Sequence, residues 1–389
     1  MGVLNKIKRW VHLWGSQFSV NRIENNHCDD NDTVLLIKLD AIGDFIIWLD
    51  SAKEYPKVFP DRKIVLLCNS LCKELAEATG LFQEILTLDI KKYENDFQYR
   101  VAQEKLLSER KFGLLVQTAF SRTQHMDYLA ASVFAHQKIG FEADESKSNL
   151  SRSIVFKRNR RKLDQVYDRL IPASKDDLME IQRNKEFIHG LGNNMFLSSL
   201  PKLPHIDSVN IPQQPYFVVF PGASTKVKMW NPDRFAKVIE YVFEKTDYDC
   251  LVCGGKNETP LYDQISNRVG RSDRLKNYCG KTSLVDLIEV VRNAKFVLSN
   301  DTSGIHYAAG TGVKGICPFG EYNFGRFLPY ETDTDKSRIA VCSPNMKCRN
   351  CSKSHMTLRC YWNILKNGRY LCLDKVTVDQ VLDEVEKIV

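Results

Sequence analysis

The feature that most constrains the fold is a repeated alternation of apolar strands and helices. Residues 33–39 (TVLLIKL) form a buried-type strand, a turn follows at residues 41–44, and a helix is expected over residues 45–55. A second set begins with a strand at residues 216–220 (YFVVF), followed by a helix over residues 232–246. Because strands that alternate with helices build parallel sheets covered on both faces, we expect an α/β chain with two Rossmann-like domains facing each other across a cleft.

Four prolines separate the two sets: Pro201, Pro204, Pro212 and Pro215. This density of prolines is typical of a linker between domains. The sequence therefore predicts four parts, with a cysteine-rich segment (342–372) inside the third: 1–30, 31–205, 206–374 and a C-terminal helix over 375–389.

The N-terminal part is basic and amphipathic. Its apolar residues fall at helical spacing beside three cations, and they are Val3, Leu4, Ile7, Trp10, Val11, Trp14 and Phe18. Such a helix could lie on an anionic bilayer or pack on its own domain. Either arrangement is compatible with the pattern.

The overall charge narrows the class of partner. Lys and Arg number 55 against 48 Asp and Glu, and this net charge of +7 suits an anionic substrate or a membrane surface rather than nucleic acid. No uncharged apolar run reaches the ~18 residues that a membrane span needs, and no signal peptide is expected. We therefore expect a cytoplasmic protein, and peripheral contact with the cytoplasmic face of the inner membrane stays open as one of two alternatives.

Loops that follow strands are the places to look for a site, because ligands of such sheets bind beyond the carboxyl ends of the strands. In the first loop Asp44 follows Gly43 at a helix start, where it is either an N-cap or a general base. In the third loop Glu258 could accept from ribose hydroxyls or belong to an ordinary turn.

The two remaining loops are suited to anions. Residues 221–230 (PGASTKVKMW) combine small residues, the hydroxyls of Ser224 and Thr225, and the cation of Lys228, as a phosphate cradle would. Residues 299–306 (SNDTSGIH) place hydroxyls and backbone N–H groups at a helix start. His306 lies in the first turn of that helix, where a lone histidine is more often structural.

Three segments resemble those of glycosyltransferase family 9, the ADP-heptose:lipopolysaccharide heptosyltransferases. They are VLLIKLDAIGDFIIW, FPGASTKVKMWNPDRF and CGKTSLVDLIEVVRNAKFVLSNDTSGIHYAAGTGV, and the resemblance runs from about residue 33 to residue 389. Two positions depart from the family pattern. Ser303 replaces the signature glycine and Phe220 replaces a histidine, which leaves the donor sugar and nucleotide open.

The resemblance implies a GT-B fold and an inverting transfer without a catalytic metal. The donor would be a nucleotide-activated heptose or related sugar, with ADP-heptose as the first candidate, and the acceptor a lipopolysaccharide core or another anionic surface glycan. Residues 31–205 would face the acceptor, and residues 206–374 would bind the nucleotide sugar. Asp44 matches the catalytic base. The donor-binding residues implied are Ser224, Thr225 and Lys228 at the diphosphate, Glu258 at the ribose, Thr282, and Asp301, Thr302, Ser303, Gly304 and His306 at the helix start.

Four cysteines near the C-terminus have metal-ligand spacing: Cys348-x2-Cys351-x8-Cys360-x11-Cys372. Four thiolates suit tetrahedral zinc or iron, which we expect to be structural. The alternative is a set of reduced, unliganded thiols. Similar clusters occur in family members that act on autotransporter proteins, where bound iron has a structural role.

Three other functions remain open. A protein of this fold could transfer the sugar to a protein acceptor. It could also be a sugar-nucleotide epimerase, which converts its sugar nucleotide with no acceptor present. A third reading is a non-enzymatic module built on the four cysteines. Binding of nucleic acid is not expected, because few aromatic residues lie among the cations near the cysteines.

Overall fold

The computed structural model describes residues 27–142, 162–207, 209–270, 273–349, 351 and 356–389. The predicted N-terminal amphipathic helix lies outside these residues. The chain forms two compact units. The first unit contains the described residues of Met1–Asp40, Glu54–Ser174 and Glu186–Asn194, and the second unit contains those of Ala41–Lys53, Lys175–Lys185 and Met195–Val389.

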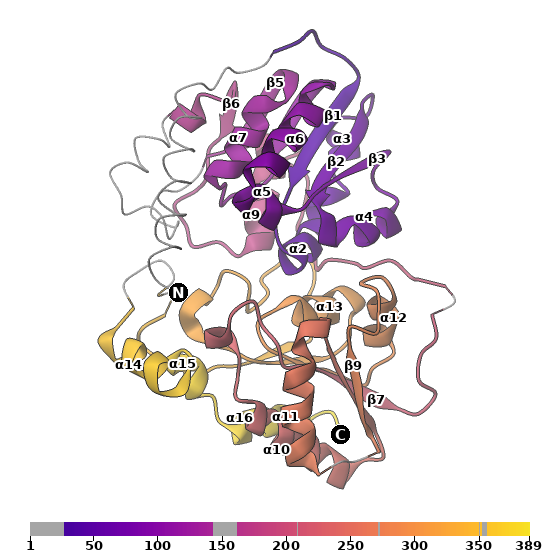
Figure 1. The fold of residues 1–389 in the computed structure, drawn as a ribbon, viewed down its shortest axis with the longest axis vertical. Helices are drawn as coiled ribbons and strands as arrows, with labels where there is room; N and C mark the ends of the chain where they lie inside the picture. The colour runs from indigo at the N-terminus through magenta and orange to yellow at the C-terminus, as the bar shows by residue number, and fades with distance from the viewer. Residues whose placement is uncertain (1–26, 143–161, 208, 271–272, 350, 352–355) are drawn as a thin grey trace. The chain divides into compact units, whose positions relative to one another are not determined.

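The first unit is built on a six-stranded parallel sheet (Figure 1). Its strand order is β3-β2-β1-β4-β5-β6, and the strands are β1 (Thr33–Lys38), β2 (Lys63–Asn69), β3 (Glu84–Leu88), β4 (Lys111–Gln117), β5 (Phe134–Phe141) and β6 (Arg169–Ile171). The order reverses beside β1, so right-handed connections place helices on both faces. These helices are α3 (Tyr55–Val58), α4 (Lys73–Thr79), α5 (Ile90–Asn95), α6 (Phe97–Ser108) and α7 (Gln124–Ser132).

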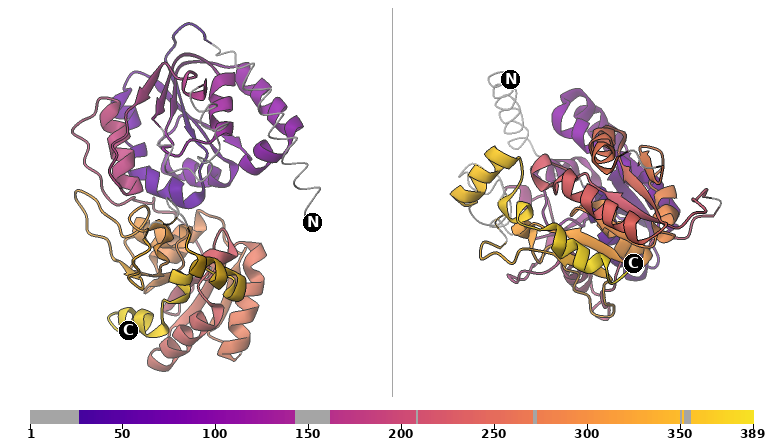
Figure 2. Two further views of the ribbon diagram at one scale, coloured as in Figure 1. Left: turned by 90° about the vertical axis from the view of Figure 1, so that its left-hand side faces the viewer. Right: turned by 90° about the horizontal axis from the view of Figure 1, so that it is seen from below.

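The second unit repeats this plan with its own core. The order of its parallel strands is β12-β11-β10-β7-β8-β9, and they are β7 (Tyr216–Phe220), β8 (Asp249–Gly254), β9 (Leu275–Cys279), β10 (Val297–Ser299), β11 (Gly315–Pro318) and β12 (Ile339–Cys342). Its helices (Figure 2) are α2 (Ile42–Ala52), α10 (Pro232–Lys245), α11 (Thr259–Val269), α12 (Asp286–Arg292), α13 (Ser303–Thr311), α14 (Leu358–Asn367), α15 (Leu371–Asp374) and α16 (Val378–Val385). A further helix, α9 (Glu180–Gly190), contributes residues to both units.

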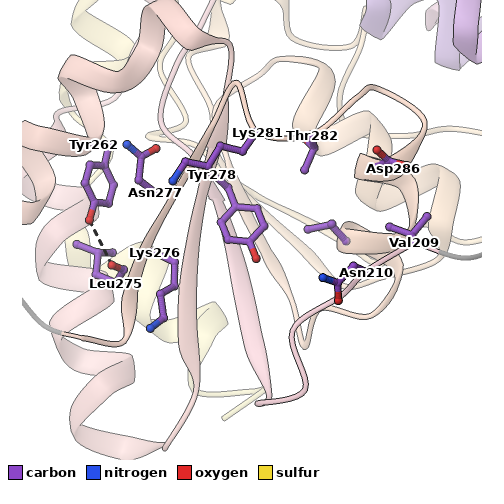
Figure 3. A pocket seen from close by; sticks show the side chains of 11 residues that line it. Val209, Asn210, Tyr262, Leu275, Lys276, Asn277, Tyr278, Lys281, Thr282 and Asp286 are labelled. Carbon is purple, nitrogen blue, oxygen red and sulfur yellow. Dashed lines mark hydrogen bonds between the residues drawn. The ribbon is translucent and has the colours of Figure 1, made fainter.

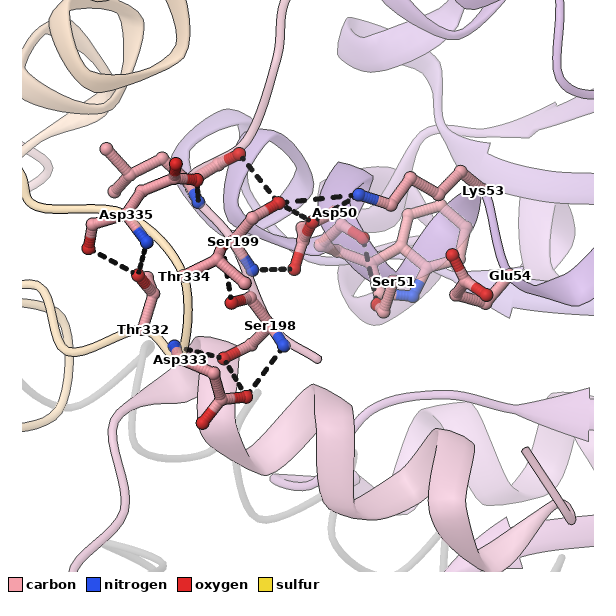
Figure 4. Close-up of polar contacts among 12 residues, drawn as sticks. Asp50, Ser51, Lys53, Glu54, Ser198, Ser199, Thr332, Asp333, Thr334 and Asp335 are labelled. Atoms are coloured by element: carbon pink, nitrogen blue, oxygen red, sulfur yellow. Dashed lines mark hydrogen bonds and ion pairs between the residues drawn. The ribbon is translucent and has the colours of Figure 1, made fainter. Parts of the chain in front are cut away.

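Helix α2 follows a strand of the first unit but belongs by its contacts to the second. Figure 4 shows Asp50 accepting hydrogen bonds from the backbone N–H and the hydroxyl of Ser199, at 2.8 and 2.6 Å. In the same network Asp333 accepts from the backbone N–H and the hydroxyl of Ser198, at 2.7 and 2.9 Å. This network holds α2 to the segments before β7 and after β11.

The predicted α/β class with two Rossmann-like sheets is confirmed. The sequence patterns missed β5, β6, β9 and β12. The polar run His136-Gln137-Lys138 interrupts β5, and β6, β9 and β12 are edge strands that need fewer apolar residues. In the described part of the chain, no helix is long and apolar enough to cross a membrane.

Candidate functional site

The buried amide of Asn300 joins two of the predicted loops in the second unit. Its Nδ2 donates to the carbonyls of Pro221 and Gly222, at 2.7 and 3.2 Å, and its Oδ1 accepts from the backbone N–H of Trp230 at 2.9 Å. Asn300 is fully buried, so all three bonds are shielded from water. The loop after β7 and the loop after β10 are thereby fixed side by side.

A pocket of about 250 Å³ opens at these two loops and at the start of α2. Seven of the predicted site residues line it: Asp44, Ser224, Lys228, Asp301, Thr302, Ser303 and His306. Their neighbours in the lining, which sequence reasoning did not single out as functional, are Ala41, Ile42, Gly43, Asn323 and Phe327. All twelve residues belong to the second unit.

Two helix starts meet at the pocket. Asp44 lies in the first turn of α2, whose N-cap position is held by Ala41, so the interpretation of Asp44 as an N-cap is wrong. Thr302 precedes α13, and among the described residues its side chain makes no cap hydrogen bond to that helix. The N–H of Ile305 donates to the carbonyl of Thr302 at 3.2 Å. The N–H groups of Ser303 and Gly304 are therefore the ones at this helix start that could meet an anion.

Lys228 and Asp301 supply opposite charges in the lining. The Lys228 ammonium lies 5.2 Å from the centre of the Tyr322 ring, and the Tyr322 hydroxyl donates to Asp301 at 3.2 Å. Burial raises the pKa of Asp301 to about 6, although Lys228 and Tyr322 act in the opposite direction. Burial also holds the pKa of Tyr322 well above its ordinary value, so its hydroxyl stays protonated.

His306 is a buried, neutral wall of the pocket. Burial lowers its pKa to about 3, so the ring carries no charge at pH 7. Its Nδ1 forms a hydrogen bond of 2.5 Å with the hydroxyl of Tyr330. A Cβ at Gly43 would lie 2.8 Å from His306 Cδ2, so the close approach of α2 to α13 requires glycine there.

Glu258 is not part of the pocket lining, yet it lies against the same loop. Its carboxylate accepts from the backbone N–H of Gly255 at 2.8 Å, and a Cβ at Gly222 would lie 1.6 Å from its Oε1. Burial raises the pKa of Glu258, while the hydrogen bond from Gly255 opposes the rise. Glu258 is therefore close enough to the 221–230 loop to contact the same ligand.

The structure does not bring the remaining three predicted donor-binding residues into the pocket lining. Thr225 is exposed on the 221–230 loop, where its carbonyl accepts from the Lys228 backbone. Gly304 is buried in α13, where a Cβ would lie 2.4 Å from the Phe220 ring. Thr282 lines a second, open pocket of about 730 Å³ beside the edge strand β9 (Figure 3).

The four predicted metal ligands lie on and before α14 and α15. Cys360 and Cys372 are buried, and Cys348 and Cys351 are partly buried. Burial raises the pKa of Cys351, and the nearby Cys360 and Cys348 raise it further. Within the described residues, however, no three His, Cys, Asp or Glu side chains are placed to hold a common metal ion, so the thiols do not form a ligand set in this arrangement.

Sequence reasoning also missed two residues that organise the site from behind its lining, Asn300 and Tyr322. Asn300 stands between Ser299 and Asp301 in a segment already singled out, so its position was a usable signal. Tyr322 follows β11 in a short turn (Glu321–Asn323), and no glycine-rich or hydroxyl-rich pattern around it marks it as part of the site.

Two Rossmann-like sheets, with an anion-suited pocket beyond the carboxyl ends of the second, are the features of a GT-B protein. The chain belongs to glycosyltransferase family 9 (heptosyltransferase), whose family model matches residues 129–361. A curated relative is lipooligosaccharide heptosyltransferase 2 of Campylobacter jejuni, 28% identical over 162 residues, which cover 38% of this chain and 50% of the relative. The chain thus matches about half the length of that relative.

Solved structures of heptosyltransferases share this fold. E. coli ADP-heptose lps heptosyltransferase II matches with a TM-score of 0.65 and 14% identity, over 92% of this chain and 98% of that one. E. coli heptosyltransferase WaaC, solved with ADP-2-deoxy-2-fluoro heptose, matches with a TM-score of 0.61 and 15% identity, over 92% and 100%. The iron-containing dodecameric glycosyltransferase TibC of enterotoxigenic E. coli matches with a TM-score of 0.55 and 12% identity, over 94% and 78%. At these identities the likeness is one of fold, and the predicted GT-B fold is confirmed.

Proposed function

We propose that the chain is an inverting glycosyltransferase that moves a heptose, or a related sugar, from ADP-heptose to a lipopolysaccharide-core or other anionic surface-glycan acceptor. The observation that carries the proposal is the shared pocket of Asp44, Lys228 and the N-terminal end of α13. A carboxylate can act as a general base, and a cation with helix N–H groups can stabilise the negative charge on a leaving diphosphate without a metal. The WaaC complex with an ADP-heptose analogue supports the choice of donor.

The donor would be held by its diphosphate. Lys228, the Ser224 hydroxyl and the first N–H groups of α13 would contact the phosphate oxygens, with Thr302 and Ser303 beside them. Glu258, next to the same loop, would accept from the ribose hydroxyls. A buried neutral His306 would shape the wall without adding charge.

The transfer step would begin at Asp44. Its carboxylate would take the proton of the acceptor hydroxyl, and the acceptor oxygen would attack the anomeric carbon from the side opposite the diphosphate. The bond from the anomeric carbon to the leaving oxygen would break, and the diphosphate would depart with the electron pair. Lys228 and the α13 N–H groups would stabilise the charge that develops on it, and the anomeric configuration would invert.

Two variants separate chemistry from donor binding. Asp44→Asn should retain donor affinity and lose turnover by about 10²- to 10⁴-fold, because general-base catalysis contributes that much. Lys228→Ala should weaken binding of ADP or a non-transferable ADP-sugar by roughly 10- to 100-fold in calorimetry. Lys226→Ala, in the same turn but outside the pocket lining, is the matched control. If Asp44→Asn kept a turnover near that of the wild type, Asp44 would not be the general base.

We also propose that Cys348, Cys351, Cys360 and Cys372 bind a structural zinc or iron ion. Support comes from their spacing and from the iron-containing neighbour TibC. Binding would draw the four thiolates closer together than they lie here. Metal analysis of the purified chain should find about one zinc or iron per chain. The variant Cys348→Ser/Cys351→Ser should lose it, and a metal-free wild type would refute the proposal.

A further inference from the structure

Helix α14 presents an apolar face to solvent. Leu358, Tyr361, Trp362 and Leu365 are 77%, 48%, 66% and 60% exposed. At ~3.6 residues per turn these four positions fall within an arc of about 100°. A helix on the surface of a globular unit normally turns such a stripe toward the core, and α14 turns it outward.

The opposite side of α14 already has its packing partners. Cys360 is buried, and its sulfur accepts from the backbone N–H of Leu371 at 3.5 Å. The Asn363 side chain donates to the carbonyl of Arg369 at 3.0 Å. The helix is therefore anchored to the α15 segment by one side, and the exposed stripe is not needed for that anchoring. Figures 1 and 2 show α14 next to α15 and at the margin of the second unit.

The segment around the stripe is strongly basic. Residues 336–373 contain eight Lys and Arg residues and no Asp or Glu. Arg359 and Lys366 are exposed on α14 itself, about 80–100° around the helix from Leu358, and so border the stripe. A partner for this face should therefore have an apolar surface opposite the stripe and negative charge opposite Arg359 and Lys366.

We propose that this face of α14, the α14 stripe, docks the enzyme on an anionic bilayer. Trp and Tyr favour the headgroup region, the two leucines would enter the acyl boundary, and Arg359 and Lys366 would meet lipid phosphates. An antiparallel two-fold contact with a second copy is disfavoured, because it would bring the cationic edges of the two helices together. The N-terminal segment is disfavoured as the occupant for the same reason, since Lys6, Lys8 and Arg9 make it basic.

The test measures flotation of the full chain with vesicles, and it requires no turnover. Vesicles of phosphatidylcholine with phosphatidylglycerol should bind the chain, and pure phosphatidylcholine should bind it far less. Trp362→Ser/Leu365→Ser should weaken binding to the anionic vesicles on the order of tenfold or more. Arg359→Gln/Lys366→Gln should weaken it by roughly tenfold, and added salt should abolish the difference from wild type.

The matched control is Phe97→Ser/Leu106→Ser on α6, which removes two residues that are also more than half exposed. This control should bind vesicles as the wild type does, and thermal melting should show that all variants are folded. The proposal is overturned if the α14 variants float like the control. It is also overturned if Trp362→Ser/Leu365→Ser changes the oligomeric mass in the absence of vesicles, since the stripe would then be a contact between copies. Either result leaves the proposed transfer reaction intact, because that reaction is tested at Asp44.

Discussion

Asp301 and His306 stand five residues apart in the pocket wall, and burial favours the neutral form of both. The pKa of Asp301 rises to about 6 and that of His306 falls to about 3. At pH 7 the histidine is neutral while Asp301 is still largely ionised beside Lys228. The pocket therefore gains net positive charge when Asp301 takes up a proton.

This titration should appear in donor binding. Asp301 is anionic above pH 6 and neutral below it, so affinity for an ADP-sugar should rise several-fold between pH 7.5 and pH 5. Calorimetry with an intact ADP-sugar measures this without interference, because the terminal phosphate of ADP would itself titrate near pH 6. Asp301→Asn should bind with a flat pH profile. If the affinity of that variant still changed with pH as in the wild type, a group other than Asp301 would be the one that titrates.

The sequence predicted those site residues whose signal lies in the residues next to them in the chain. Asp44, Lys228, Thr302 and Ser303 follow strands in loops rich in glycine or hydroxyls, and they line one pocket. Tyr322 could not be found in that way. Its contacts to Lys228 and Asp301 depend on how three loops fold together, and no spacing in the chain encodes that.

At the scale of elements, the pocket depends on how closely α2 approaches α13. Gly43 is the contact point, because any Cβ there would press on His306. The alternation of strands and helices predicted both helices. It did not predict that α2 would pack in the second unit although it follows β1 of the first. That packing depends on contacts with residues distant in the sequence, such as Ser199.

Gly43→Ala should separate the two helices and lower the free energy of unfolding by about 1–3 kcal/mol. Because the Cβ would lie 2.8 Å from His306 Cδ2, removing the ring should make room for it. Urea unfolding of Gly43→Ala, His306→Ala and the double variant forms a thermodynamic cycle. The double variant should be more stable than the sum of the single effects. Strict additivity would show that the two side chains do not interact.

At the scale of the whole molecule, the units are not continuous stretches of sequence. The sequence predicted a change of domain near the four prolines, because proline density is a local signal. The contacts instead assign Ala41–Lys53 and Lys175–Lys185 to the second unit. The boundaries expected from the sequence stay a prediction, since contact clustering and domain function need not coincide.

Donor binding should therefore protect segments that are far apart in sequence. With a saturating ADP-sugar, hydrogen exchange should slow in α2, in residues 221–230 and in the first turns of α13, because all three border the pocket. The strands β2 and β3 of the first unit, which lie outside the pocket lining, serve as the internal reference. Protection of the 221–230 and α13 peptides without α2 would contradict the assignment of α2 to the donor-binding unit.

The placement of α2 also affects how the protein is made. During translation, α2 is synthesised about 250 residues before the first residues of α13. At ordinary translation rates that interval is roughly 10–50 s. During it Ile46 and Trp48, which are fully buried in the finished protein, have no completed unit to enter. The nascent chain should therefore be a client of ribosome-associated chaperones, and its yield should fall more steeply when they are depleted than that of an α/β protein with contiguous domains.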